Sequence, residues 1–139
     1  MDTPWSAAAD RLEQNGWLSA ADADRLRFLW WFGNAIANSD RHYGNVSLQL
    51  TDTRPLTLTP AYDTLPMLYS PSVTGELIPR EFTPTLPPPR EAAVCQRATA
   101  AGLQFWQQVR VDHRLSENFR AIAADSERKL QAFARRLDS

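Results

Sequence analysis

Apolar side chains recur every three or four positions in four stretches of the chain, which is the spacing of an α-helix with one buried face. The stretches predict helices over about residues 6–15, 20–37, 91–110 and 116–137. Ser19 is a good N-cap for the second stretch, with Asp22 three positions on, and Gly16 suits the left-handed residue that follows a helix. The first two helices should therefore be joined by a short turn.

The two C-terminal helices are amphipathic, so they should pack together as a helical base. The buried stripe of the first is expected at Val94, Ala98, Ala101, Phe105 and Val109. That of the second is expected at Leu115, Phe119, Ile122, Leu130, Phe133 and Leu137. The helix over 20–37 should be buried on most sides, because Phe28, Trp31 and Phe32 fill much of its remaining circumference.

Alternating apolar and polar residues with turn chemistry between them predict a small β-hairpin over about residues 46–58. Nine of the ten prolines lie between Pro55 and Pro89, and this density predicts an irregular loop over residues 64–90. A chain of 139 residues can bury a core of its own. The fold expected is thus one domain over residues 1–139, mainly α with a small β-hairpin.

Composition excludes several classes of function. The net charge of −1 provides no basic surface, so neither direct nucleic-acid binding nor attraction to an anionic membrane is expected. The single cysteine, Cys95, excludes a disulfide framework and a zinc site of several cysteines, and it should be buried on a helix. No signal peptide and no membrane-spanning stretch are visible, so the expected location is the cytoplasm.

Polar and ionisable side chains gather in the segment 38–45, between the apolar helix and the hairpin. Phosphoryl transfer needs a carboxylate that accepts the proton of the attacking hydroxyl, and oxygen ligands that hold magnesium against the phosphates. In protein kinases the base and the amide ligand are five residues apart, as are Asp40 and Asn45, and Asp63 follows the second strand as a second carboxylate. Roles in turns and strand ends are the alternative for all three.

The sequence around these residues resembles the HipA family, the kinase toxins of bacterial toxin–antitoxin modules. The resemblance rests on Ile-Ala-Asn-Ser-Asp-Arg-His-Tyr-Gly-Asn-Val-Ser-Leu over 36–48 and Leu-Thr-Pro-Ala-Tyr-Asp-Thr-Leu-Pro-Met over 58–67. It implies a protein-kinase-like C-lobe of the HipA type, with Asp40 as catalytic base and with Asn45 and Asp63 as ligands of Mg²⁺ in the presence of ATP. It also implies a protein serine or threonine hydroxyl as acceptor.

Two neighbours of Asp40 bear on the choice among kinases. His42 could donate a hydrogen bond to the phosphoryl oxygens or could fix the shape of the loop, and both readings are open. The order Asp-Arg-His with Asn three further on also resembles phosphoinositide-type lipid kinases, which makes a lipid kinase a second alternative. Arg41 is expected to pair with a carboxylate or a carbonyl.

The glycine-rich loop and strand lysine of a complete kinase are missing, because the five glycines are scattered and Lys129 is the one lysine. The N-lobe is therefore expected to be absent and supplied by another segment or chain, and the isolated chain is expected to be inactive. A pseudokinase or protein-binding module is the first alternative. The HipA resemblance implies an aminoacyl-tRNA synthetase as a substrate candidate and a DNA-binding antitoxin as a partner.

Overall fold

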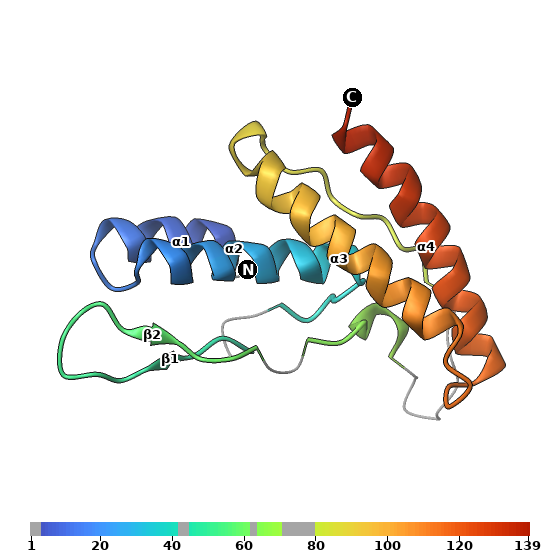
Figure 1. Cartoon of the computed structure of the whole chain (residues 1–139), viewed down its shortest axis with the longest axis horizontal. Coiled ribbons are helices and arrows are strands. Elements are labelled where there is room, and N and C mark those ends of the chain that lie inside the picture. The colour runs from blue at the N-terminus through green and yellow to red at the C-terminus, as the bar shows by residue number, and fades with distance from the viewer. Residues whose placement is uncertain (1–3, 42–44, 62–63, 71–79) are drawn as a thin grey trace.

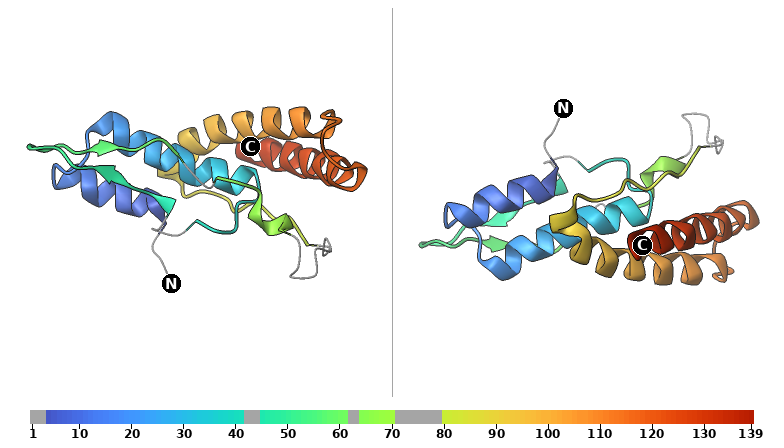
Figure 2. Two further views of the ribbon diagram at one scale, coloured as in Figure 1. Left: turned by 90° about the horizontal axis from the view of Figure 1, so that it is seen from below. Right: turned by 90° about the horizontal axis from the view of Figure 1, so that it is seen from above.

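The computed structural model describes residues 4–41, 45–61, 64–70 and 80–139, so the candidate site residues His42 and Asp63 lie outside the described residues. The described chain is mainly helical with one two-stranded antiparallel sheet (Figure 1). In chain order the elements are α1 (Trp5–Gln14), α2 (Ala20–Ala35), β1 (Leu48–Gln49), β2 (Thr57–Leu58), η2 (Met67–Tyr69), η3 (Pro89–Glu91), α3 (Ala92–Arg110) and α4 (Glu117–Leu137). Both views of Figure 2 place α1 and the hairpin toward one end and α4 toward the other, with α2 between them.

Helices α1 and α2 form a helical hairpin, as the sequence predicts. Gly16 turns the chain with φ +74°, and the Ser19 hydroxyl accepts a hydrogen bond from the backbone N–H of Asp22 to begin α2. Arg27 of α2 clamps α1 by donating to Asp10 Oδ1 at 2.8 Å and to Glu13 Oε1 at 2.7 Å. These ion pairs link the polar edges of the two helices. A small apolar cluster fills the space between the helices, and its buried members are Trp5, Ala9, Leu18, Ala23 and Leu26.

The end of α2 comes two residues earlier than the prediction of a helix to residue 37. Ala37 adopts φ +62°, a left-handed conformation, and the N–H of Asn38 bonds to the carbonyl of Gly33 at 2.8 Å. This is the hydrogen bond of a helix that ends through a left-handed residue, a position usually held by glycine. The prediction was wrong because Ala37 is an apolar residue in phase with the helix, and its side chain is buried in the core although its backbone has left the helix.

The predicted hairpin is present, with strands shorter than the span 46–58. Leu48 pairs with Leu58 and Gln49 with Thr57. The hairpin is fastened to α2 and to the turn before it, because Asp22 Oδ2 accepts from the Leu58 N–H at 3.0 Å and Leu56 N donates to the Trp17 carbonyl at 2.8 Å. The sequence pattern did not indicate either attachment.

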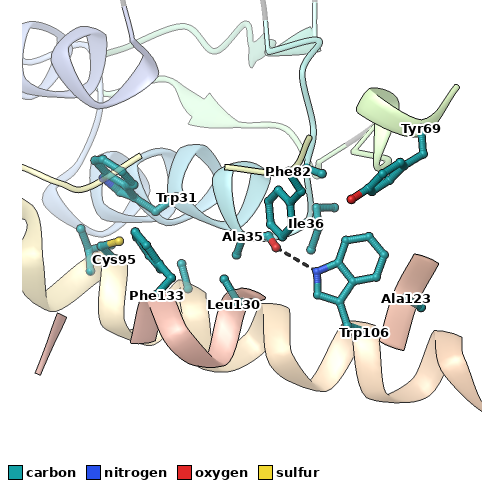
Figure 3. Close-up of a cluster of buried hydrophobic side chains, with 13 residues drawn as sticks. Trp31, Ala35, Ile36, Tyr69, Phe82, Cys95, Trp106, Ala123, Leu130 and Phe133 are labelled. Carbon is teal, nitrogen blue, oxygen red and sulfur yellow. Dashed lines mark hydrogen bonds between the residues drawn. The ribbon is translucent and has the colours of Figure 1, made fainter. Parts of the chain in front are cut away.

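The helical base consists of α3 packed on α4, with the end of α2 lying against α3 (Figures 1 and 3). Trp106 is at its centre, with no exposed surface, and its indole Nε1 donates to the carbonyl of Ala35 at 3.0 Å (Figure 3). Gly102 allows the close approach, since a Cβ there would lie 2.5 Å from the Cβ of Ala35. Free Cys95 is fully buried, as expected.

The expected stripes of the base were partly wrong. On α3 the buried residues are Val94, Cys95, Ala98, Thr99, Gly102 and Trp106. Ala101, Phe105 and Val109 are half-buried, so the core face is centred on the adjacent set of residues rather than on the predicted stripe. On α4, Leu130 and Phe133 are buried as predicted, but Leu115 precedes the helix and is exposed. The innermost faces include small and polar residues that hydropathy does not detect, such as Gly102 at the crossing with α2 and Ser126, whose hydroxyl bonds to that of Tyr69.

The proline-rich region is irregular where it is described, apart from the two short 3₁₀ turns. Residues 80–88 run as an extended strap across α2, with Phe82 buried in the main core. Asn34 holds the strap with both ends of its amide, because Nδ2 donates to the Thr85 carbonyl at 3.1 Å and Oδ1 accepts from the Thr85 N–H at 2.8 Å. Among the described residues no helix is both long and apolar enough to cross a membrane.

Candidate catalytic loop

The segment that follows α2 is shaped by side chains that bond to its backbone. Asn38 is almost fully buried at 3% exposure, and its Oδ1 accepts a hydrogen bond from the backbone N–H of Asp40 at 3.1 Å. An asparagine that bonds to the N–H two residues on forms an Asx turn. Asn38 therefore shapes the turn that leads into Asp40.

Asp40 and Asn45 come together in the structure. The Nδ2 of Asn45 donates to the backbone carbonyl of Asp40 at 2.8 Å, although five residues separate them along the chain. Only the NH₂ end of an amide can donate to a carbonyl, so this bond fixes which way the amide of Asn45 points. Its Oδ1 is left as an acceptor on the other side. The loop thus holds Asp40 by its N–H and by its carbonyl.

Arg41 anchors the same loop to α2. It donates from Nη1 to the carbonyl of Trp30, and the carbon of its guanidinium lies 3.8 Å from the centroid of the Trp30 ring. Its aliphatic stem crosses Gly33 so closely that a Cβ on that glycine would lie 2.5 Å from Arg41 Cδ. Burial lowers the pKa of Arg41 to about 10. The expected pairing with a carbonyl is confirmed, and Gly33 also shapes the loop, which no local sequence pattern indicates.

The chain that leads toward Asp63 lies beside Asn45. Thr59 pairs with Ser47, because its N–H and its Oγ1 both donate to the Ser47 carbonyl, at 3.0 and 2.9 Å. A small cavity of about 10 Å³ is lined by Asn45 together with Pro60, Ala61 and Thr64. The described residues on both sides of positions 62–63 are thus close to Asn45. Asp63 and His42 lie outside the described residues, and their expected roles stay predictions.

Other chemically interesting groups lie elsewhere. In residues 4–41, 45–61, 64–70 and 80–139, no three His, Cys, Asp or Glu side chains are grouped as a metal site would require. Lys129 is on α4, where its Nζ pairs with Asp125 at 3.2 Å, and His113 is exposed beside Arg120. Burial raises the pKa of the Cys95 thiol to about 11, which disfavours a thiolate nucleophile.

Comparisons with known proteins identify one curated relative. No family model and no solved structure matches the chain. Over 127 residues the chain is 35% identical to Toxin YjjJ of Escherichia coli (strain K12), and the match covers 91% of this chain. The chain spans 28% of the length of that toxin. The chain is therefore a homologue of part of a bacterial protein that is named as a toxin.

Proposed function

We propose that this chain carries the catalytic loop of a HipA-like kinase toxin, which transfers the γ-phosphoryl group of ATP to a serine or threonine hydroxyl of a protein with Mg²⁺. In this proposal the fold is a kinase-type C-lobe, and the ATP-gripping N-lobe is supplied by another segment or chain. The observation that carries the proposal is the 2.8 Å hydrogen bond from Asn45 Nδ2 to the carbonyl of Asp40.

This bond matters because it links the candidate base to the candidate metal ligand. Asn45 donates with one end of its amide, so its carbonyl oxygen Oδ1 remains for a hard cation, and oxygen is the ligand that Mg²⁺ prefers. Asp40 is held by its N–H as well, through Asn38. Fixing the backbone on both sides of Asp40 limits the directions in which its carboxylate can point, and positioning supplies much of the catalysis in phosphoryl transfer.

The roles of the side chains follow from this arrangement. Asp40 would accept the proton of the attacking hydroxyl while the oxygen of that hydroxyl bonds to the γ-phosphorus and ADP leaves. Asn45 would hold Mg²⁺ through Oδ1, with Asp63 as the second ligand by resemblance. The metal neutralises charge on the phosphates when it is bound. His42 would contact the transferred group only if it faces the phosphates rather than fixing the shape of the loop.

The toxin relative supports the biological side of the proposal. HipA-like kinases are toxins of toxin–antitoxin modules, and the relative is itself named a toxin. A toxin of that kind would have an antitoxin, which by resemblance binds DNA, and would inhibit growth by modifying an essential protein. An aminoacyl-tRNA synthetase is the substrate candidate that the resemblance provides.

The experiment is a label-transfer assay with γ-³²P-ATP and Mg²⁺, in the longest natural product that contains this chain. Asp40→Asn should lower turnover by about two to four orders of magnitude, the usual contribution of a general base. Asp52→Asn, an exposed carboxylate in the hairpin loop, is the matched control and should be as active as the parent. A protein substrate and phosphoinositide vesicles are offered in parallel, so transfer to the vesicles alone would identify a lipid kinase.

Asn45 provides the sharper variant pair. Asn45→Ala removes both the donor and the oxygen ligand, so turnover should fall and the Mg²⁺ concentration for half-maximal activity should rise. Asn45→Asp keeps oxygen ligands but cannot donate to Asp40, so it should bind Mg²⁺ and still turn over slowly. Parental activity in Asp40→Asn would overturn the proposal. Nucleotide binding without any transfer in the parent would favour a pseudokinase.

A further inference from the structure

A cavity of about 340 Å³ lies behind the candidate loop, between the start of α1, the middle of α2 and the end of the proline-rich strap. Its walls include the side chains of Trp30, Trp31, Leu86 and Pro88, and the polar residues Ser6 and Arg41 also line it. Cavities of this size with apolar walls and a few placed polar groups are typical of ligand sites. No function described above uses this one.

Arg41 places its charged end at this cavity. Its aliphatic stem crosses Gly33, which lines a different and smaller cavity together with Ser39. Its guanidinium lies over the ring of Trp30, which lines the 340 Å³ cavity. The side chain therefore leads from the backbone next to Asp40 through to the back of the loop. Within the described residues only Nη1 makes a hydrogen bond, to the Trp30 carbonyl.

No carboxylate in the described part of the chain pairs with this guanidinium. Arg27 shows the usual arrangement, since it has a side chain 20% exposed and ion pairs with both Asp10 and Glu13. Arg41 has a carbonyl and an aromatic face instead, and burial alone lowers its pKa to about 10. It still carries its charge at neutral pH. Withdrawing a cation from water is costly unless an anion or several hydrogen bonds offset the loss of hydration.

The charges around the cavity favour an anion. Arg90 also lines it, and the one carboxylate in the lining, Glu91, already accepts from Trp31 Nε1 at 3.1 Å and lies 3.9 Å from Arg90 Nε. Two guanidiniums and one carboxylate therefore line the cavity, and Asp10, outside the lining, has its Oδ2 3.9 Å from Arg90 Nη2. The donors of Arg41 that bond to none of the described residues lie in the plane of the guanidinium, and two of them can meet two oxygens of a phosphate.

We propose that this cavity binds a phosphate monoester carried on a serine or threonine side chain, with Arg41 as the residue that receives the phosphate. The apolar walls indicate a phosphate attached to a peptide rather than inorganic phosphate, since Leu86, Pro88 and the two indoles would contact the flanking peptide. This binding site goes beyond the proposed kinase activity and does not depend on it. Because Arg41 adjoins Asp40, an occupied site would also restrain the candidate loop.

The test is a titration of the 139-residue chain followed through the ¹H–¹⁵N signals of its indole groups. The ligands are N-acetyl-phosphoserine methylamide, its unphosphorylated form and inorganic phosphate. The phosphoserine compound should shift the signals of Trp30 and Trp31 in a saturable way and leave that of Trp106, which lies in the helical base, in place. Its dissociation constant should be at least about ten-fold lower than that of inorganic phosphate.

Four variants make the result decisive. Arg41→Gln should abolish the shifts, and Arg41→Lys should weaken binding by at least about ten-fold because an ammonium lacks the planar fork. Arg54→Gln is the matched control, since Arg54 also stacks on an indole, 3.7 Å from the Trp17 centroid, but on the hairpin. If Arg41→Gln fails to fold, Arg41→Lys and Arg90→Gln decide. Absence of shifts in the parent, shifts that survive Arg41→Lys undiminished, or equal affinity for inorganic phosphate would overturn the proposal.

Discussion

The helical base and the candidate loop are held together by different forces. In the base, Trp106, Leu130 and Cys95 have no exposed surface, and the contacts between α3 and α4 are mainly apolar. In the loop, the backbone of Asp40 donates a hydrogen bond to Asn38 and accepts one from Asn45, and Arg41 bonds to a backbone carbonyl. Apolar burial is strong but does not depend on direction, whereas a hydrogen bond is weaker and fixes an orientation.

The difference teaches where each kind of mutation should act. A change in the base should lower the free energy of unfolding, because apolar burial is the dominant favourable contribution to folding. A change in the loop should alter how Asp40 is presented while most of the stability remains, because one hydrogen bond contributes only about 0.5–1.5 kcal/mol. The variants below test that division, from the largest expected effect to the smallest.

Truncation of the central indole should have the largest effect. Trp106→Ala removes a fully buried aromatic side chain and its hydrogen bond to Ala35, which should lower the free energy of unfolding by about 3–5 kcal/mol. Urea unfolding followed by far-UV circular dichroism measures the change. Trp17→Ala is the control, because Trp17 is 38% exposed and should cost less than half as much. Equal losses in the two variants would show that the base does not dominate stability.

The contrast also explains how much of the structure could be predicted from the sequence. Helices and the hairpin follow from local signals, such as the Ser19 cap, Gly16 and the spacing of apolar residues, so they were found to within a few residues. The end of α2 was misplaced because Ala37 looks like another helical residue until tertiary packing forces its backbone to φ +62°. The innermost face of α3 was misplaced because Gly102 carries no hydropathy signal, although it sets the distance to α2.

For the candidate site, the sequence suggested the residues but not the bonds between them. The spacing of Asp40 and Asn45 suggested two separate roles, and the structure adds that one bonds to the backbone of the other. The importance of Gly33 depends on the path of Arg41, and the cavity behind Arg41 depends on the end of the strap and on η3. Such features join segments that are distant along the chain, so no local pattern reveals them.

The stability of the chain should change with pH in opposite directions for a group in the helical base, Cys95, and a group in the candidate loop, Arg41. Burial raises the pKa of Cys95 from its usual 9.0 to about 11, so the unfolded chain loses this proton first. Between pH 9 and 11 the folded state therefore binds more protons, and stability should fall by about 2–3 kcal/mol from this thiol. The lowered pKa of Arg41 acts in the opposite direction, since there the unfolded state keeps its proton longer as pH rises above about 10.

The measurement is urea unfolding of the parent and of Cys95→Ala at intervals from pH 8 to pH 11. The difference in unfolding free energy between the two proteins cancels the contribution of Arg41, which both contain. This difference should shrink as pH rises, because only the parent loses the stability that comes from the Cys95 thiol. A difference that stays constant with pH would mean that Cys95 titrates alike in both states. Arg41→Gln measured in the same way should show the reverse trend.

Two glycines with equally close neighbours should respond differently to a methyl group. In Gly102→Ala the new Cβ would lie 2.5 Å from the Cβ of Ala35. That Cβ is fixed to a helix backbone and cannot rotate away, so the free energy of unfolding should fall by about 1–3 kcal/mol. In Gly33→Ala the new Cβ meets Arg41 Cδ, also at 2.5 Å, which is part of a flexible side chain. The higher helix propensity of alanine offsets about 1 kcal/mol in both.

Gly33→Ala should therefore leave the unfolding free energy almost unchanged while it moves the guanidinium off Trp30. Urea unfolding gives the first quantity, and the shift of the Trp30 indole signal in a ¹H–¹⁵N spectrum gives the second. If Gly33→Ala destabilised the chain as much as Gly102→Ala, Arg41 would be a structural anchor of the base rather than an adjustable part of the loop.

The smallest effects are expected from two serine caps, one in the helical base and one at the start of α2, the helix that leads to the candidate loop. Ser116 accepts from the Phe119 N–H at 3.1 Å at the exposed start of α4, and Ser19 accepts from the Asp22 N–H at 3.1 Å at the start of α2. Ser116→Ala should cost about 1 kcal/mol, the usual value for a cap. Ser19→Ala should cost somewhat more, because Asp22 also holds the hairpin through Leu58, and loss of the cap loosens that carboxylate. Urea unfolding measures both costs, and amide hydrogen exchange at Leu58 should accelerate in Ser19→Ala alone. Equal exchange at Leu58 in the two variants would show that the hairpin is held independently of the first turn of α2.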